Sequence, residues 1–285
     1  MLHGSCLCGD VAWEAASPPQ FMSHCHCSMC RKMHGTAFGT YVGTAAEGFR
    51  WTRGDGGITR FVSSPGGGRR FCSRCGSPLP VGPAEGNMFL PAGGLDDDPG
   101  VRPMVHIFVA SKAPWYDLAD SLPRFDAFPP GVGQAVERPA PPSVPAGRAR
   151  GSCLCDTVTW EVDGAPARMA NCHCARCRKA RGAAHATNAF WPLGAFRWLS
   201  GEAAVRRYRV PEAQYFANCF CGTCGAKTPR LDPSRDLAVV PAGALDHDPG
   251  LRPQMHIFVA SKAPWYEISD DLPRHHGAPA SAASR

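Results

Sequence analysis

Short runs of alternating or β-branched residues, broken by Gly, Pro and Asp, cover most of the chain, and long helical periodicity is absent. Residues 11–14 (VAWE) alternate between apolar and polar side chains, as a half-buried strand does. A helix of one or two turns is expected after Cys27, with a second after Cys174. The pattern predicts a mostly β protein. Further runs of strand-forming residues occur at 49–52, 58–62, 88–90 and 106–109.

The second half of the chain repeats the first. The GSCLC at 4–8 returns at 151–155, and FCSRCG at 71–76 returns as FCGTCG at 220–225. HIFVASKAPWY at 106–116 recurs unchanged 150 residues later. Because the offset between the copies grows only from 147 to 150 residues, the copies differ by small loop changes. The chain is therefore a tandem duplication of one domain, and two copies of this length exclude a solenoid.

These repeats divide the chain into four expected parts. Residues 1–127 and 150–276 are the two domains. Residues 128–149 are rich in Pro (FPPG, PAPPSVPAG), which is typical of an extended, semi-rigid linker. The small, polar residues 277–285 are expected to form a frayed tail.

Composition predicts a cytoplasmic protein without a membrane partner. Hydrophobic residues make up 44% of the chain, and the N-terminus lacks the charged and apolar regions of a signal peptide. No apolar run reaches the roughly 18–20 residues of a membrane span. In a reducing cytoplasm, clustered cysteines indicate metal sites rather than disulfides.

Fourteen of the fifteen cysteines form the same three groups in both copies. Two thiolates at C-x-x-C spacing can reach one metal ion at a tight turn, so the repeated pattern predicts zinc or another thiophilic metal. The fifteenth, Cys219, has Arg70 at its equivalent position and is expected to be a spectator thiol, or else a competing ligand. The groups are C-x-C (Cys6, Cys8; Cys153, Cys155), C-x-C-x-x-C (Cys25, Cys27, Cys30; Cys172, Cys174, Cys177) and C-x-x-C-G (Cys72, Cys75; Cys221, Cys224).

The first and third groups together supply four thiolates, enough for one closed tetrahedral site. Gly76 and Gly225 are expected to take a positive φ there and to donate N–H groups to sulfur. The middle group then keeps three ligands and one open position, as a catalytic zinc site does. An extended backbone points Cys25 the same way as Cys27. Other assignments of these cysteines to sites stay open.

The fourth position of the three-cysteine site has several candidates. His26 and His173 lie between ligands in an extended chain and should point away, which favours a supporting role around the site. A distant His, Asp or Glu could close the site and make it structural. The acidic segments at 96–98 and 246–248 precede Pro-Gly turns, and solvated turns are expected there rather than metal sites.

The formal charge of +6 does not predict a nucleic-acid partner. Fourteen thiolates with four Zn²⁺ ions add six negative charges, so the loaded chain would be close to neutral. No Lys/Arg-rich tail or stripe is present in the sequence.

The order of the motifs resembles the glutathione-dependent formaldehyde-activating enzymes, the GFA/CENP-V domain family. The motifs are G-x-C-x-C, C-H-C-x-x-C-R-K, F-C-x-x-C-G and H-I-F-V-A-S-K-A-P-W, and the resemblance covers nearly all of each copy. It implies two tandem β-tent domains with two zinc ions each, up to four per chain. It matches Cys6, Cys8, Cys72, Cys75, Cys153, Cys155, Cys221 and Cys224 to structural zinc, and Cys25, Cys27, Cys30, Cys172, Cys174 and Cys177 to catalytic zinc.

The family's named activity joins formaldehyde to glutathione, giving S-(hydroxymethyl)glutathione, and is classed as a carbon–sulfur lyase. This sequence departs from the family pattern at Asp156, which stands where the first copy has Gly9, and in its tandem arrangement. The first departure bears on the local geometry of the second copy. The second leaves open whether both sites turn over.

The expected chemistry suits a site of three thiolates. Coordination to zinc lowers the pKa of a thiol and holds it as the nucleophilic thiolate. The open position could instead polarise an aldehyde oxygen. Because three thiolates leave the site with a net negative charge, thiol exchange is favoured over strong activation of water.

Four cationic side chains are candidates for binding the substrate: Arg31 and Arg178, just after the last ligand, and Lys112 and Lys262. The alternatives are a hydrogen bond from each Arg to a coordinating sulfur and a solvated Lys. Trp115 and Trp265 are expected to pack in the core rather than wall a pocket. His106 and His256 are expected to be satisfied core histidines rather than general bases.

The sequence therefore predicts a zinc-dependent carbon–sulfur lyase acting on a small thiol and an aldehyde-derived or thioether-type substrate. The alternative is a non-catalytic tandem zinc module that binds a protein partner, since the fold would support either. The identity of the substrate and the oligomeric state do not follow from the sequence.

Overall fold

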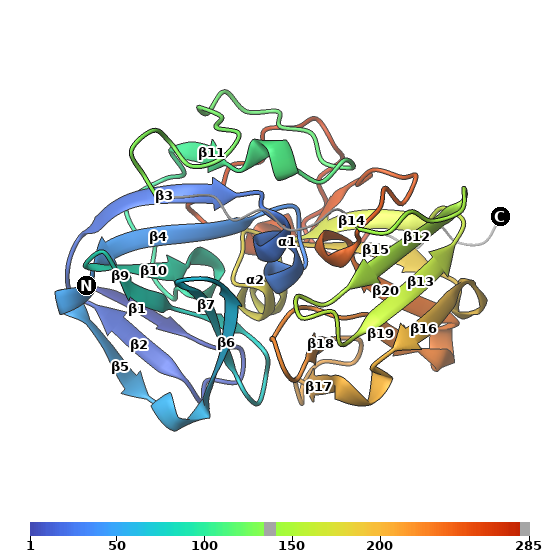
Figure 1. The fold of residues 1–285 in the computed structure, drawn as a ribbon, viewed down its shortest axis with the longest axis horizontal. Helices are drawn as coiled ribbons and strands as arrows, with labels where there is room; N and C mark the ends of the chain where they lie inside the picture. The colour runs from blue at the N-terminus through green and yellow to red at the C-terminus, as the bar shows by residue number, and fades with distance from the viewer. Residues whose placement is uncertain (134–140, 280–285) are drawn as a thin grey trace.

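The computed structural model describes residues 1–133 and 141–279, and the two repeats form two β-rich halves that lie side by side (Figure 1). The first half holds three sheets, and the prediction of a mostly β fold is confirmed. The sheets have the orders β1-β2-β5 (Leu2–Ser5, Ala12–Ala15, Phe49–Arg53), β11-β3-β4-β10-β9 (Val105–Ile107, Pro19–Cys25, Gly39–Ala45, Asn87–Pro91, Val81–Ala84) and β6-β7-β8 (Ile58–Ser64, Gly67–Cys72, Pro78–Leu79).

The second half repeats this architecture, with a two-stranded sheet in place of the three-stranded β6-β7-β8 sheet. Its five-stranded sheet, like that of the first half, is antiparallel except for one parallel edge strand. The orders are β12-β13-β16 (Arg148–Ser152, Thr159–Asp163, Phe196–Ser200), β19-β20-β15-β14-β21 (Arg230–Asp232, Leu237–Pro241, Ala186–Trp191, Arg168–Cys172, His256–Ile257) and β17-β18 (Val205–Arg209, Ala217–Cys221).

Strand alternation places large side chains in the core, as the pattern at 11–14 predicts. In β2, Trp13 and Ala15 are buried, and Ala12 and Glu14 are partly exposed. The run at 106–109 is a partial exception, because β11 ends at Ile107. Phe108 takes a left-handed φ of 60°, which ends the extended backbone, so the strand predicted through residue 109 was too long.

Two helices follow the central cysteines, where short helices were predicted. They are α1 (Ser28–His34) and α2 (Ala175–Arg181), and each ends at a left-handed Gly. Short 3₁₀ turns connect many strands: η1 (Ala46–Gly48), η2 (Asp55–Gly57), η3 (Ala92–Gly94), η4 (Val109–Ser111), η5 (Leu193–Ala195), η6 (Glu202–Ala204), η7 (Pro233–Arg235), η8 (Ala242–Ala244) and η9 (Val259–Ser261).

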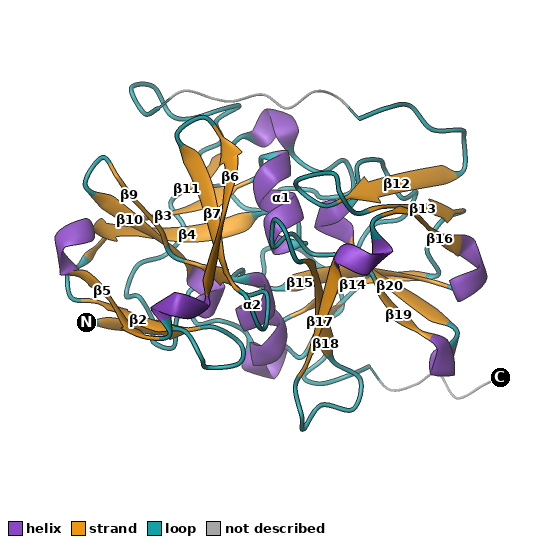
Figure 2. Cartoon of the chain, turned by 60° about the horizontal axis from the view of Figure 1, so that its bottom comes forward, coloured by secondary structure: helices purple, strands orange, loops and turns teal. Residues whose placement is uncertain are grey.

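The two helices lie between the halves, where the copies pack in a reciprocal arrangement (Figure 2). α1 packs on η8 of the second copy, and α2 packs on η3 of the first. Gly243 and Gly93 allow this approach, because an added Cβ would lie 2.2 Å from the carbonyl oxygen of Thr36 and 2.3 Å from the amide nitrogen of Ala183. The tandem chain thus builds internally the kind of reciprocal interface that a symmetric dimer would form.

Ion pairs cross the same interface. Lys32, 4% exposed, donates to the Ser152 carbonyl oxygen (3.1 Å) and pairs with Asp246, at 2.5 Å. In the reciprocal contact, Lys179 pairs with Asp96 at 2.5 Å. The acidic segments at 96–98 and 246–248 were expected to be solvated turns. This holds for Asp96, whose side chain is 42% exposed, whereas that of Asp246 is only 15% exposed; both carboxylates also neutralise lysines of the opposite copy.

Parts of the predicted linker and tail, residues 134–140 and 280–285, lie outside the described residues. The boundaries expected for the two domains stay a prediction. Among the described residues, no helix is long and apolar enough to cross a bilayer.

Candidate metal centres

Four clusters of cysteine sulfurs form, two in each half, and each could hold a metal ion. Within each cluster, all sulfur atoms lie within 4.8 Å of one another. Two clusters have four cysteines and two have three. The members are Cys6, Cys8, Cys72 and Cys75; Cys153, Cys155, Cys221 and Cys224; Cys25, Cys27 and Cys30; and Cys172, Cys174 and Cys177.

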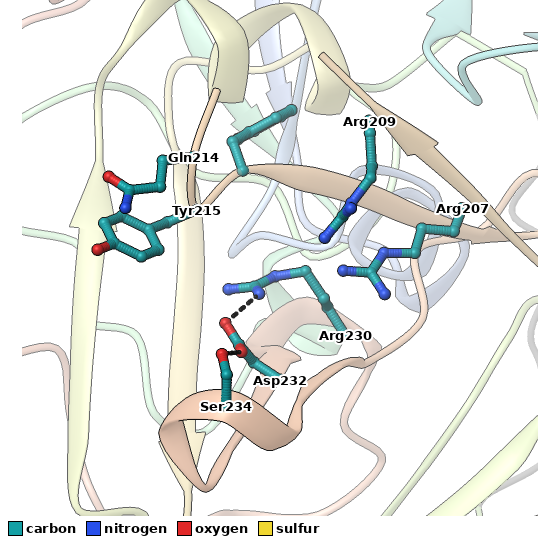
Figure 3. Close-up of a pocket in the computed structure, with 8 residues that line it drawn as sticks. Arg207, Arg209, Gln214, Tyr215, Arg230, Asp232 and Ser234 are labelled. Carbon is teal, nitrogen blue, oxygen red and sulfur yellow. Dashed lines mark hydrogen bonds and ion pairs between the residues drawn. The ribbon is translucent and has the colours of Figure 1, made fainter. Parts of the chain in front are cut away.

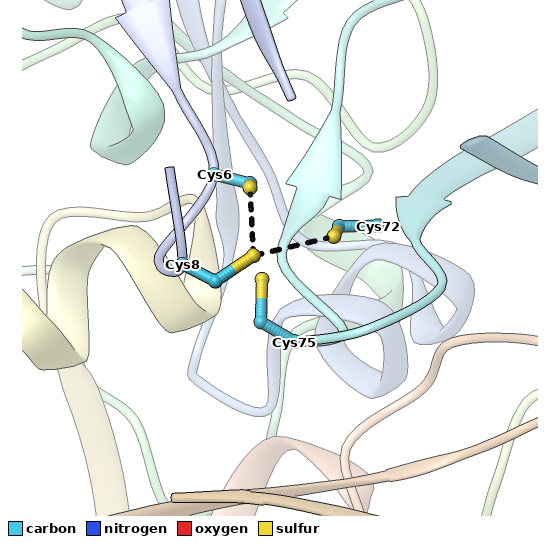
Figure 4. Close-up of side chains that lie close together, drawn as sticks. All are labelled: Cys6, Cys8, Cys72 and Cys75. Carbon is cyan, nitrogen blue, oxygen red and sulfur yellow. Dashed lines mark hydrogen bonds between the residues drawn. The ribbon is translucent and has the colours of Figure 1, made fainter. Parts of the chain in front are cut away.

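Each four-cysteine cluster joins the turn after the first strand of its half to a C-x-x-C turn. Figure 4 shows the cluster of the first half. The Cys8 sulfur lies 3.4 Å from that of Cys6 and 3.7 Å from that of Cys72. In the second half, the Cys155 sulfur lies 3.5 Å from Cys153 and 3.8 Å from Cys221. Four sulfurs around one point suit a closed tetrahedral ion.

The glycine of each C-x-x-C-G turn has the left-handed backbone that was expected, with φ of 71° at Gly76 and 75° at Gly225. Its hydrogen bond differs from the expectation. The N–H of Gly76 donates to the Cys72 carbonyl oxygen (2.8 Å) rather than to sulfur. A backbone N–H does reach sulfur elsewhere in the cluster, from Val11 to Cys6 (3.3 Å).

Asp156 keeps the geometry of the glycine that it replaces. Its φ is 57°, in the same left-handed region as Gly9 at 77°. Asp is among the residues that tolerate this conformation, so the turn that positions Cys153 and Cys155 survives the substitution.

Each three-cysteine cluster sits where a strand becomes a helix. Cys25 ends β3, Cys27 caps α1, and Cys30 lies in the first helical turn. The Cys27 sulfur accepts a hydrogen bond from the N–H of Cys30 (3.3 Å), which fixes the sulfur over the helix N-terminus. The second copy repeats this at Cys174 and Cys177 (3.4 Å).

The described residues supply no fourth ligand atom to either three-cysteine cluster from His, Cys, Asp or Glu. The alternative in which a distant side chain closes the site therefore finds no support in the structure. Three protein ligands and one open position are the arrangement of catalytic metal sites.

Hydrogen bonds among the thiols of one cluster shift their pKa values in opposite directions. Contacts from Cys172 and Cys177 lower the pKa of Cys174 to about 3. The hydrogen bond between Cys172 and Cys174 helps to raise the pKa of Cys172 to about 12. In the first copy, contacts from Cys25 and Cys30 likewise lower the pKa of Cys27. In both clusters the pKa of the helix-capping sulfur is lowered, and the backbone N–H that this sulfur accepts favours the same thiolate.

Both halves match the model of one family, described as the glutathione-dependent formaldehyde-activating enzymes. The model matches residues 1–111 and 148–261, most of the chain. The chain belongs to this family. Its double match agrees with the duplication and with the cysteine clusters in both halves.

Individual relatives resemble one half at a time. A protein from Halomonas elongata, with a provisional name as a glutathione-dependent formaldehyde-activating enzyme, is 33% identical over 128 residues. The match covers 41% of this chain and 81% of that protein. A crystal structure of a Rhodobacter sphaeroides protein matches 35% of this chain and 91% of its own, at 24% identity and a TM-score of 0.30.

The histidines between the ligands point away from sulfur in this member of the family. His26 Nε2 lies 2.8 Å from His106 Nδ1, and His106 Nε2 lies 2.9 Å from the Asp120 carboxylate. His173, His256 and Asp270 repeat the chain of hydrogen bonds. Since both His106 nitrogens have partners in the buried interior, it is the satisfied core histidine that was expected. Burial lowers the pKa of His26 to about 3, so the imidazole stays neutral.

The expected substrate-binding cations are largely engaged with backbone. Arg31 Nε donates to the Ser111 carbonyl oxygen (3.2 Å), and Arg178 Nε to that of Ser261 (3.1 Å). Lys112 donates to the carbonyl oxygens of Ala113 (3.3 Å) and Tyr116.

Lys262 repeats these contacts in the second copy, with Ala263 and Tyr266. Trp115 and Trp265 are 1% and 2% exposed, in agreement with a core role.

Proposed function

We propose that the protein is a zinc-dependent carbon–sulfur lyase of the cytoplasm, which joins a glutathione-like thiol to an aldehyde carbon and reverses the reaction. The observation that carries this proposal is the three-cysteine cluster. Its sulfurs converge at a helix N-terminus, and no fourth His, Cys, Asp or Glu of the described residues completes it. Membership of the family and the name of the Halomonas relative support the same chemistry.

The donor sets fit zinc. Thiolates are soft ligands that select zinc among the common divalent ions. The four-cysteine clusters would hold structural ions, and the three-cysteine clusters would hold the reactive ones. Zinc bound by three thiolates would leave one position for a thiol or an aldehyde oxygen and would keep a bound thiol deprotonated.

The chain's own groups position this site. The N–H groups of Cys30 and Cys177 orient the capping sulfurs. Behind them, the neutral His26 imidazole is hydrogen-bonded to His106, and His106 to the Asp120 carboxylate, which fixes the segment between the ligands. With Nε committed to a carbonyl, Arg31 and Arg178 still have terminal nitrogens to offer a substrate carboxylate.

The reaction balances without an oxidant or reductant. The thiol sulfur forms a bond to the carbonyl carbon, the π electron pair moves to oxygen, and the proton that the thiol lost ends on that oxygen. The reverse step breaks the same carbon–sulfur bond and returns thiol and aldehyde. A catalyst therefore needs to supply a thiolate and to hold the two partners together.

The test measures exchange between free glutathione plus formaldehyde and S-(hydroxymethyl)glutathione by NMR, with and without the zinc-loaded chain. The variant Cys27→Ser/Cys174→Ser removes the capping sulfur from both centres and should abolish the acceleration. Ala175→Ser is the matched control, since it adds a hydroxyl to the exposed neighbour of Cys174 and keeps all sulfurs. Turnover by the double variant equal to that of the parent would contradict the proposal.

A further inference from the structure

The space beside the three-cysteine cluster differs between the copies. In the second copy, a cavity of about 150 Å³, called the inner cavity below, reaches the cluster at Cys172 and Cys177. A second cavity of about 240 Å³, the outer cavity, shares Tyr215, Phe216 and Arg230 with it. Together they reach the lower end of the roughly 300–1,000 Å³ of small-molecule sites.

The inner cavity has features of a built ligand site. Thr228, 2% exposed, lines it, and its hydroxyl finds no hydrogen-bond partner in the structure's described parts. A buried polar group without a partner is costly, and a ligand can supply the missing hydrogen bond. Cys219, the thiol expected to be a spectator, lines the same cavity and does not belong to a metal cluster.

The outer cavity is cationic (Figure 3). Arg207 and Arg209 extend into it from β17, and Arg230 faces them from β19. Arg230 is neutralised by Asp232 at 3.0 Å. Among the described residues, the guanidinium groups of Arg207 and Arg209 have no ion pair. Two unpaired guanidinium groups at the mouth of a cavity suit a ligand with carboxylates.

The register of the strands identifies the corresponding positions in the first copy, where this charge pattern is absent. Arg209 pairs with Ala217 in the second copy, and Val62 pairs with Gly68 at the same place in the first, so Val62 stands where Arg209 does. The other replacements are Val81 for Arg230 and Leu79 for Thr228, whereas Arg60 corresponds to Arg207.

Instead, an arginine covers the first three-cysteine cluster. Arg69 Nη2 lies 3.7 Å from the Cys30 sulfur and within hydrogen-bonding range of it. The equivalent residue in the second copy is Asn218, which donates to the Cys75 carbonyl oxygen of the other half (2.7 Å) rather than to a cluster sulfur. There, Arg181 lines the cavity together with Cys172 and Cys177. Tyr41, hydrogen-bonded to His34 (2.7 Å), stands in the first copy where the second has Asn188.

We infer that the copies are unequal: the second three-cysteine centre has the substrate cavity, where Arg207 and Arg209 hold the carboxylates of an acidic thiol, and Arg69 caps the first. This rests on the proposed function for the identity of the reactive centre. The thiol end of the ligand lies toward Cys172 and Cys177, and its acidic end lies in the arginine cavity. The first copy then serves as the packing partner that completes the interface.

The inference is tested by isothermal titration calorimetry of reduced glutathione into the full zinc-loaded chain. One equivalent per chain is expected, and two equal sites, or no saturable binding, would overturn the inference. Arg207→Glu and Arg209→Glu should each weaken binding at least tenfold. Arg206→Glu makes the same charge change on the same strand outside the cavity and should leave the affinity unchanged. Equal effects of all three variants would refute the assignment.

Two further measurements test the roles of the arginines in binding. Cysteamine, a thiol without a carboxylate, should bind at least tenfold more weakly than glutathione, and equal affinity would overturn the role of the arginines. Arg69→Asn should not weaken glutathione binding, and a loss of binding would place Arg69 in the ligand site. Binding at one site without turnover would refute the proposed lyase and keep this inference, whereas turnover with two equal sites would do the reverse.

Discussion

The buried ion pair between Lys32 and Asp246 offers a quantitative test of how the halves hold together. The Lys32 side chain is 5% exposed and that of Asp246 is 15% exposed. Their reciprocal counterparts, Lys179 and Asp96, are 23% and 42% exposed. The two pairs therefore share chemistry and position, and differ in access to water.

Asp246→Asn keeps the shape of the side chain and removes its charge, which takes the Asp246 counter-charge away from the buried Lys32 ammonium. Removal of one partner of a buried pair costs about 3–5 kcal/mol. Asp96→Asn makes the same change where water can solvate the lysine, and pairs of that kind are worth about 0–1 kcal/mol. Since about 1 kcal/mol shifts the Tm of a chain of this size by roughly 2–4 °C, Asp246→Asn should lower Tm by at least about 6 °C.

Urea unfolding of the zinc-loaded protein, followed by circular dichroism, measures the free energy of unfolding for both variants under one condition. Calorimetry supplies Tm. Equal losses within about 0.5 kcal/mol would refute the reasoning, because burial would then not determine the cost of the missing charge. A loss below about 1 kcal/mol for Asp246→Asn would show that the Lys32 ammonium is solvated in the folded protein.

Three other predictions concern the metal, the interface and pH. Elemental mass spectrometry of the reduced chain should find about four zinc ions, with two indicating that the three-cysteine clusters stay empty. Gly243→Ala should cost about 1–3 kcal/mol in urea unfolding, since its Cβ would meet Thr36, whereas Gly194→Ala, in open space, should be near neutral, and similar losses would contradict the packing argument. Burial lowers the pKa of His34 to about 3, so below pH 6.5 only the unfolded chain takes this proton. Stability should fall toward pH 3 by up to about 1.4 kcal/mol per pH unit from this group, and His34→Gln should flatten that slope; an unchanged slope would refute the assignment.

Local sequence patterns predicted much of the fold and the sulfur geometry. Alternation located β2, runs of strand-forming residues located β5, β6 and β10, and the cysteine spacing anticipated all four clusters. The strand through residue 109 failed because Phe108 adopts a left-handed φ, which a strand-forming residue type does not signal. Arg207 and Arg209, which line a cavity, and Arg69, beside the Cys30 sulfur, were missed. A comparison of strand register between the copies could have marked their unequal positions.

The sequence by itself determined the duplication, the β character and the cysteine groups, since each depends on residues a few positions apart whose relative placement backbone geometry fixes. Only the tertiary structure decided how the copies face each other. Lys32 reaches Ser152 across 120 residues, and no periodicity encodes that contact. It also decided that Arg69 reaches the Cys30 sulfur whereas Asn218, at the equivalent strand position, bonds to the other half, because surrounding packing sets what each side chain can reach.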